Sequence, residues 1–305
     1  MNLRLFLILT LSFWLQLWGC SVNKVCGQEP LPKSLLWEIS KAFNPSKSYL
    51  YGTIHVQDQR VFDFADSVMI CYNNCQQYAG EIVIDNIDAK TLAPQMLLSK
   101  GQSLKSLIGK KYFKKIKIHL RQHRMGIYTL VINKMKPFVV MAILSENDLP
   151  KDKAQVLDDY LQKLAKKNHM NVVGLETIEE QMGAVNKIPL DKQVALLKLS
   201  IDSLKNSAST KDNGYEEMLK IYLDQDIEQL QAFAEDNDEL STEFVDHVLL
   251  ERNIRMADRI IDLIKIQPTF IGVGAAQLGG KQGIIALLKS SGYTVRPVLA
   301  GFSKK

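Results

Sequence analysis

Short apolar runs alternate with helical patterns along the chain. Strands are predicted where β-branched and aromatic residues cluster, and helices where apolar residues recur every three or four positions. The predicted strands are residues 48–51, 77–84, 171–175, 269–273 and 293–298. The predicted helices are residues 88–100, 110–124, 156–164, 190–204, 212–246 and 281–290, with one more opened by the capping box Thr177-Ile-Glu-Glu180 and one beginning near Thr242. Because strands and helices alternate without a Pro, Gly or Ser-rich linker, the pattern predicts a single α/β domain.

Composition agrees with a packed domain of enzyme size. Of the 305 residues, 46% are hydrophobic and 23% are charged, which excludes a disordered, collagen-like or coiled-coil chain. The formal net charge of +5 is too small and too spread out to indicate nucleic-acid binding. The segment 110–124 is rich in Lys and Arg, and we interpret it as a solvated helix surface rather than a binding patch.

The first residues indicate export. An apolar run from Leu5 to Trp18 has the length of a signal-peptide core and is short for a membrane span. We therefore predict a signal peptide over residues 1–27 and a mature domain over residues 28–305, located in the periplasm or cell envelope. Lipidation at Cys20 and a retained N-terminal anchor are the alternatives.

Two cysteines remain after the predicted cleavage, Cys71 and Cys75. A pair four residues apart can close a small loop in an oxidising compartment, whereas two Cys alone make a poor zinc site. We expect a disulfide or two inert thiols rather than a metal site.

Three polar side chains interrupt or follow apolar strands, where packing alone does not explain them. His55 follows Gly52 at the end of a buried strand, and ligands commonly bind at strand ends of α/β sheets. Glu81 lies within the apolar run 77–84, where an unpaired carboxylate would cost several kcal/mol, so it requires a cation. Glu176 ends another apolar strand. The structural alternatives are a hydrogen-bonded histidine and an exposed glutamate before a helix cap.

Two further positions complete the candidate site. Arg252 falls on the apolar stripe of the helix that begins near Thr242, so it faces the core. A buried guanidinium needs a carboxylate or an anionic ligand as its partner, and Glu81 and Glu176 are the candidates. A structural salt bridge is the alternative for Arg252. Gln277 follows Gly274 by three residues, as His55 follows Gly52, so the two side chains are expected on one rim of the sheet.

The order of these motifs resembles the TraB/GumN family, which also contains the Tiki-type metalloproteases. The resemblance covers nearly all of residues 28–305 and implies an α/β domain with a mixed central β-sheet flanked by many helices. It also implies a site built from paired Gly-x-x-His motifs, a Glu and an Arg. The matching segments are Leu36-Trp-Glu-Ile39, residues 49–56 with Gly-Thr-Ile-His55, Glu81, Gly174-Leu-Glu-Thr177 with Gln181, Glu251-Arg-Asn253, residues 274–280, residues 283–288 and Gly292-Tyr-Thr-Val295.

This resemblance implies a divalent-metal-dependent, peptidase-like hydrolase. In it, His55, Glu81 and Gln277 would hold manganese, cobalt or zinc. Glu81 or Glu176 would act as the base, and Arg252 would orient substrate or stabilise developing charge. The chain departs from the pattern at Gln277, which replaces the second motif's imidazole with an amide oxygen better suited to Mg²⁺, Ca²⁺ or Mn²⁺.

The alternative function is therefore a non-catalytic envelope binding module that kept the fold. The expected partners are a peptide or small-molecule substrate, and no nucleic acid. Membrane contact is expected only through the signal peptide or a lipid anchor.

Overall fold

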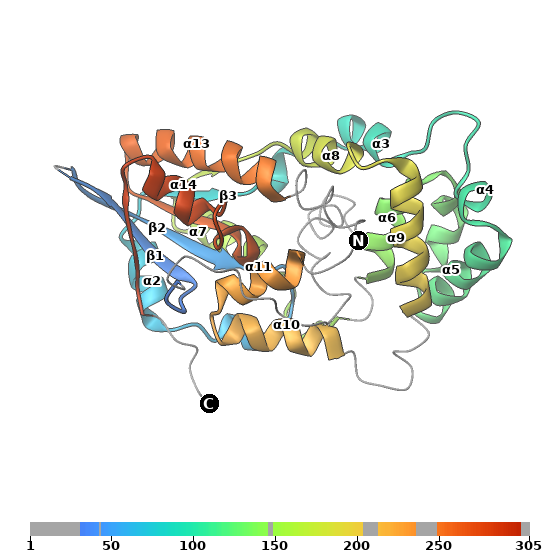
Figure 1. Ribbon diagram of the computed structural model, residues 1–305, viewed down its shortest axis with the longest axis horizontal. Coiled ribbons are helices and arrows are strands. Elements are labelled where there is room, and N and C mark those ends of the chain that lie inside the picture. The colour runs from blue at the N-terminus through green and yellow to red at the C-terminus, as the bar shows by residue number, and fades with distance from the viewer. Residues whose placement is uncertain (1–30, 43, 146–148, 204–212, 236–248, 300–305) are drawn as a thin grey trace.

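A mixed β-sheet organises the molecule, which we describe from a computed structural model over residues 31–42, 44–145, 149–203, 213–235 and 249–299 (Figure 1). In this described part the sheet has six strands in the order β4-β3-β5-β2-β1-β6. The four strands β4, β3, β5 and β2 run parallel, while β1 pairs antiparallel with β2 and β6. The strands are β1 Leu36–Lys41, β2 Asn44–Thr53, β3 Gln77–Gly80, β4 Asn171–Gly174, β5 Thr269–Gly274 and β6 Thr294–Pro297.

Helices divide between two apolar clusters. The first cluster joins the sheet to α2 (Asp66–Asn73), α7 (Leu157–Lys167), α10 (Asn213–Leu223), α11 (Ile227–Glu235), α13 (Glu251–Ile266) and α14 (Ile284–Ser290). The second cluster is helical and contains α3 (Ala89–Met96), α4 (Leu104–Ile108), α5 (Lys110–Gln122), α6 (Pro137–Ser145), α8 (Ile178–Asn186) and α9 (Leu190–Ser203). Figure 1 shows the sheet at one end of the molecule and this helical lobe at the other.

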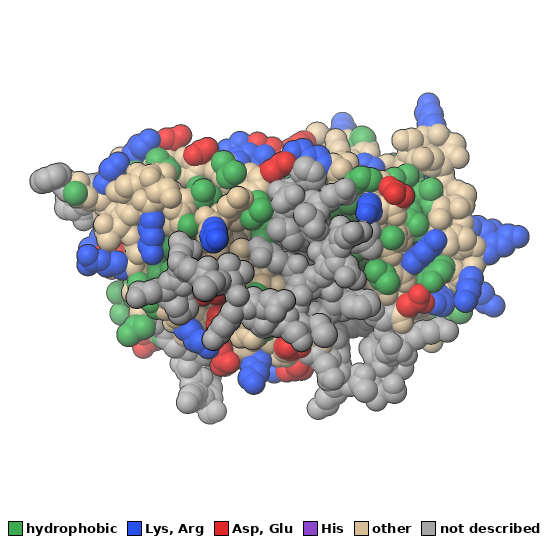
Figure 2. Space-filling view, viewed as in Figure 1, with side chains coloured by type: hydrophobic (Ala, Val, Ile, Leu, Met, Phe, Trp, Pro, Cys, Tyr) green, Lys and Arg blue, Asp and Glu red, His purple; other side chains and the backbone are tan. Residues whose placement is uncertain are grey.

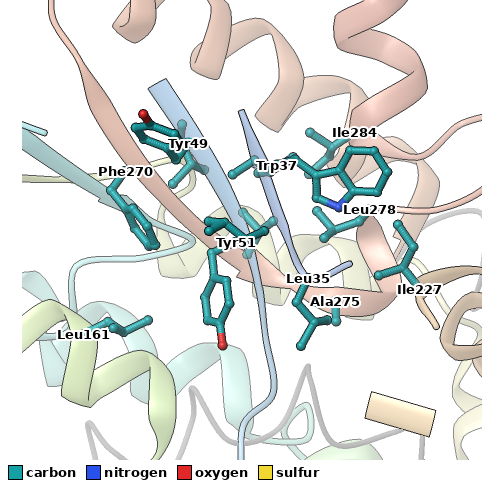
Figure 3. Packing of buried hydrophobic residues seen from close by; sticks show 14 of the residues in the cluster. Leu35, Trp37, Tyr49, Tyr51, Leu161, Ile227, Phe270, Ala275, Leu278 and Ile284 are labelled. Carbon is teal, nitrogen blue, oxygen red and sulfur yellow. The ribbon is translucent and has the colours of Figure 1, made fainter. Parts of the chain in front are cut away.

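The parallel strands β2, β3 and β5 are largely buried because aromatic and branched side chains cover them. Trp37 and Tyr51 lie in the same cluster as Leu278 and Ile284, which come from the segment after β5 and from α14 (Figure 3). Gly52 permits the close approach, since a Cβ there would lie 2.9 Å from Leu278 Cδ1. A larger residue would force Leu278 or the backbone of Ala275, 3.1 Å from the same position, to shift, so glycine lets β2 and the segment after β5 pack closely.

The structure confirms the α/β fold with its mixed sheet, and also corrects several predicted boundaries. The strand predicted over residues 77–84 ends at Gly80, because Ile82 turns into the helical cluster instead of continuing in the sheet. An apolar run can fill a second core as well as a strand, and periodicity does not distinguish the two. The antiparallel strand β1 was not predicted. The helices predicted over 88–100 and 281–290 are shorter, as α3 and α14.

Cys71 and Cys75 are free, buried thiols. Burial raises the pKa of the Cys75 thiol to about 12, so at neutral pH it stays protonated and unreactive. This agrees with the inert-thiol alternative. The predicted signal peptide, Cys20 and the residues around Thr242 lie outside the described residues. Across the residues that the structure does describe, no helix has the length and apolar character needed to cross a membrane.

Candidate functional site

The site forms at the carboxyl ends of the four parallel strands. Thr53 of β2 lies opposite Gly274 of β5, so His55 and Gln277 leave neighbouring strands at the same edge. Glu81 follows β3 directly. Glu176 follows β4, and its N–H donates to the Glu81 carbonyl at 2.7 Å. Parallel strands thus bring four side chains together from positions far apart in sequence, at the edge where α/β sheets usually bind ligands.

Arg252 of α13 bridges the two glutamates. Its Nη2 lies 2.6 Å from Glu81 Oε2 and 2.7 Å from Glu176 Oε2, and its Nε donates to the same Glu176 oxygen at 2.8 Å. Burial alone would lower the pKa of the guanidinium, but the two carboxylates raise it above the ordinary value. The expectation that Arg252 faces the core and pairs with Glu81 or Glu176 is confirmed, and the structure shows that it pairs with both.

Two neutral groups complete the surroundings of Glu81. The backbone N–H of Gly274 donates to Glu81 Oε1 at 2.9 Å, and Gln181 Nε2 donates to Glu81 Oε2 at 3.2 Å. Gln181 also lies 3.4 Å from Glu176 Oε2. Together with Arg252, these donors hold the Glu81 carboxyl group in one position at this sheet edge.

Asp158, in the first turn of α7, orients His55. His55 Nδ1 lies 3.0 Å from Asp158 Oδ2, and Thr53 donates its hydroxyl to the other carboxylate oxygen. Burial would raise the pKa of Asp158, but the hydrogen bonds from His55 and Thr53 hold it below its ordinary value. Because an ionised carboxylate only accepts, the imidazole must donate through Nδ1, which leaves the Nε2 lone pair available in the neutral ring.

Two buried polar atoms at this edge lack a partner in the described part of the molecule, His55 Nε2 and Gln277 Oε1. His55 and Glu81 line one small cavity of about 20 Å³, enough for a single water. Gln277 lies near the same glutamate, next to Gly274. A Cβ on Gly274 would lie 3.3 Å from Glu81 Oε1 and 3.6 Å from Gln277 Oε1. Glu81 is therefore the common neighbour of both unsatisfied side chains.

A larger cavity of about 270 Å³ lies beside the glutamates. Ile82 and Val83 form an apolar wall, and Glu176, Thr177 and Glu179 contribute polar groups. Ile82 also lines the small cavity. The two spaces therefore meet at one residue, and the larger one can receive a side chain or short segment of a ligand.

Three arginines on one face of α13 fix the segment after β4. Arg255 donates to Glu176 Oε1 at 2.7 Å, in addition to the contacts of Arg252. Arg259 donates to the Leu175 carbonyl at 2.6 Å and to Glu180 at 2.6 and 2.7 Å. Spacings of three and four residues place these guanidinium groups in one row along the helix. The row holds the capping box at the start of α8 against α13.

Replacing Glu180 with glutamine should remove a charge-dependent part of stability. Hydrogen bonds from Arg259 lower the pKa of Glu180 from 4.5 to about 2. A depressed pKa adds stability above pH 4.5 that is lost as pH falls toward 2. Glutamine can still accept the Thr177 N–H of the capping box. We expect Glu180→Gln to cost about 1 to 2 kcal/mol at pH 7, after allowing for solvent screening.

Urea unfolding across acidic and neutral pH checks this expectation. The difference between wild type and Glu180→Gln should shrink steadily as the pH falls below 4.5. A difference that does not change with pH would show that hydrogen-bond geometry, not charge, stabilises this contact.

The structure places all five sequence-predicted residues at one edge and adds three that the sequence did not single out for a role. Asp158 gives no local signal, because acidic residues are common in the first turn of any helix. Arg255 follows Arg252 by three residues on a helix that also carries exposed charged residues such as Asp258 and Lys265. Gln181 belongs to the family-like segment, but its contact with both glutamates depends on packing between α8 and the strand ends.

A comparison with known protein families agrees with this fold. The model of the TraB/PrgY/gumN family matches residues 35–297. The chain belongs to the TraB/PrgY/gumN family. The match extends from the segment before β1 to the end of β6, so it includes every strand described above.

Curated relatives come from animals. The chain is 26% identical to a Metalloprotease TIKI homolog of Nematostella vectensis, over 87% of this chain and 67% of the relative. It is 26% identical to Metalloprotease TIKI2 of Xenopus tropicalis (90% and 63%) and 25% identical to Metalloprotease TIKI1 of Danio rerio (93% and 66%). The chain thus spans about two thirds of the length of these relatives. No solved structure matches it significantly.

Proposed function

We propose that this TraB/PrgY/gumN family member is a divalent-metal-dependent hydrolase acting on a peptide or a related small amide. The observation that supports the proposal best is the buried, unpartnered Nε2 of His55, oriented by Asp158 and opening onto a cavity shared with Glu81. The relatives named as metalloproteases support the same class of chemistry.

The chemistry of the donor atoms fits a divalent ion, though not a strong zinc site. His55 Nε2, a Glu81 oxygen and Gln277 Oε1 would hold it, and both unsatisfied atoms would then gain a partner. Within the described residues, no group of three or more His, Cys, Asp or Glu side chains is placed to hold a metal. One imidazole with two oxygens favours manganese over zinc or cobalt. A bound ion supplies Lewis acidity, which acidifies water and polarises a carbonyl.

Each side chain then has a defined task. Glu81 lines the small cavity and is the better proton acceptor, because Glu176 is fully buried and held by two arginines. Arg252 is 3% exposed and engaged by both glutamates, so it positions Glu81. Asp158 keeps His55 in the tautomer with a free Nε2 lone pair. The larger cavity would receive the part of the substrate next to the scissile bond.

A non-catalytic binding module is the second candidate. Gln277 stands where the family motif has an imidazole, and this favours weak metal binding or none. The two cavities and their fixed carboxylates would then serve recognition alone.

Asp158→Asn tests the proposal through the orientation of His55. We expect a 10-fold to 100-fold loss of Mn²⁺ affinity, measured by calorimetry, with a parallel loss of hydrolysis of fluorogenic peptides, because orienting groups around a metal site have effects of this size. His55→Ala should abolish both.

Asp159→Asn is the matched control for this experiment. Asp159 neighbours Asp158 and is equally charged, but it pairs with Lys163 at 2.6 Å instead of with His55. Its variant should keep metal affinity and hydrolysis close to wild type. If the wild-type chain binds no divalent ion and cleaves no peptide, the hydrolase proposal is wrong and the binding module becomes the better candidate.

Export is the second part of the proposal. We propose that residues 1–27 are removed and that the mature chain acts in the periplasm or cell envelope. Intact-mass spectrometry of the exported protein should give a chain beginning at Gln28. Retention of Met1, or a diacylglyceryl group on Cys20, would contradict cleavage at this position.

A further inference from the structure

Positive charge is concentrated in one part of the chain. Residues 89–145 contain twelve Lys and Arg and no Asp or Glu. The chain has 38 basic and 33 acidic residues in total, so the remainder carries 26 basic residues against all 33 acidic ones. The protein therefore combines a strongly basic segment with a net acidic remainder. A distribution this uneven creates a directional field that orients the molecule toward a negatively charged partner.

The basic segment builds the end of the helical lobe that lies farthest from β1. Helices α4 and α5 form this end in Figure 1, and Figure 2 shows Lys and Arg side chains around it. Two short 3₁₀ turns, η4 (Gly126–Leu130) and η5 (Ile132–Lys134), follow α5, and η4 packs against that helix. The candidate site lies at the sheet edge, so the basic end is a separate surface.

Apolar side chains are exposed on this same basic end. Ten large aliphatic residues are exposed in the described part of the chain, and four of them fall within residues 118–131. Leu130 is 77% exposed and Ile127 is 71% exposed, both in η4. Ile118 and Val131 are 44% and 46% exposed. Such a concentration costs solubility without stabilising the fold, which is typical of an interaction surface.

The outer face of α5 carries three basic residues and one isoleucine. Lys111, Lys114, Ile118 and Arg121 are all exposed, and their spacings of three and four residues put them on one face. Asp202 at the end of α9 faces this helix and binds Lys115 and the Tyr112 hydroxyl. Lys115 lies on the side of α5 that faces α9, so this contact leaves the outer face positive.

We propose that this surface, formed by α5, η4 and η5, docks the protein onto an anionic phospholipid bilayer. Lys and Arg would attract the headgroups, while Ile127 and Leu130 would enter the interface between headgroups and acyl chains. The exposed aliphatic residues favour a bilayer over a soluble polyanion or nucleic acid, since neither of those offers an apolar phase. The surface adds a membrane contact to the one expected from the N-terminus, and it revises our interpretation of residues 110–124 as a merely solvated helix.

Vesicle sedimentation of the full chain tests the proposal, with wild type and variants carrying the same N-terminus. Wild type should bind vesicles of phosphatidylcholine with phosphatidylglycerol much more tightly than vesicles of phosphatidylcholine alone. Reversing three charges, with Lys111→Glu, Lys114→Glu and Arg121→Glu, should weaken binding by at least about 100-fold. The control reverses Lys151, Lys281 and Lys289, three exposed lysines outside the basic segment, and should leave binding within about threefold of wild type.

A second pair of variants separates a bilayer from other anionic partners. Ile127→Ser with Leu130→Ser should weaken vesicle binding about tenfold while leaving binding to heparin, a soluble polyanion, unchanged. In Leu130→Trp, the fluorescence emission of the new tryptophan should shift to shorter wavelength when anionic vesicles are added. The spectrum of the same chain without the substitution is the reference.

Two outcomes would overturn the proposal. Equal binding of all variants would show that the N-terminal segment alone contacts lipid. The second outcome combines three results: charge reversal weakens vesicle binding, Ile127→Ser with Leu130→Ser does not, and the emission of Leu130→Trp does not shift. This outcome would identify a soluble polyanion as the partner instead.

Discussion

Arg252→Ala should lower the free energy of unfolding by about 3 to 5 kcal/mol, because it strands buried carboxylates without their shared cation. Glu176 has no exposed side-chain surface and Glu81 is 14% exposed, so water cannot replace the guanidinium. The two glutamates also come from different strand ends, and their mutual repulsion would act directly on the edge that carries the site. Urea unfolding at neutral pH measures the loss.

Arg255→Ala is the matched control, since it removes a neighbouring arginine from the same glutamate. Arg255 is 31% exposed, and Glu176 would keep its contacts with Arg252. We expect a loss of about 1 to 2 kcal/mol for this variant. Arg252→Lys should fall between the two, because an ammonium group keeps the charge but cannot bridge both carboxylates in the same geometry. A loss from Arg252→Ala no larger than that from Arg255→Ala would show that Arg252 is not essential to the pairing.

The position of Arg252 could be predicted because helical periodicity alone decides it. A charged residue on an apolar stripe must face the core, and Glu81 within an apolar run poses the complementary problem. Each of these two charges needs a partner of opposite sign, so the sequence predicts that they pair with each other. At the end of this apolar stripe in α13, Ile264 is buried and Leu263 is only partly buried.

The convergence of strand ends was also predictable, because each polar residue follows a parallel strand at a similar distance. The features that could not be predicted from the sequence depend on long-range packing. Asp158 comes 103 residues after His55, on a helix whose sequence shows only an ordinary acidic first turn. No local pattern contains the information that this turn meets the end of β2. The same reason applies in part to β1, since its pairing with β6 depends on a partner near the far end of the chain, whereas its pairing with β2 is local.

The division of the apolar residues into two clusters explains why β3 is shorter than the strand predicted over residues 77–84. Residues 82–84 are as apolar as a strand, yet Ile82 and Ile87 pack with the helical lobe. Ending β3 at Gly80 has a chemical consequence, since it places Glu81 at the junction of sheet and lobe. There the carboxylate can reach Arg252 from one side and line a cavity on the other.

Gln277→His should raise the affinity for Mn²⁺, Co²⁺ or Zn²⁺ by more than 100-fold, because it supplies a first imidazole partner for the one on His55. Gaining a direct ligand should exceed the 10-fold to 100-fold effects typical of groups that only orient ligands. Gln277 is 4% exposed, and its Oε1 already lies beside Glu81 without a partner of its own. An imidazole in this place needs no new cavity, since its volume is close to that of the amide.

Calorimetric titration of wild type, Gln277→His, His55→Ala and the double variant decides whether the two side chains share one ion. The gain should vanish in the His55→Ala background. Gln193→His is the control, because Gln193 is equally buried in α9 and also has an unpartnered Oε1, but lies away from the sheet edge. A gain that survives His55→Ala, or one that Gln193→His reproduces, would place the new ligand outside a shared site. In that case the strand ends would lie close together, but His55 and residue 277 would not bind the same ion. Gln277 would then belong to a recognition surface.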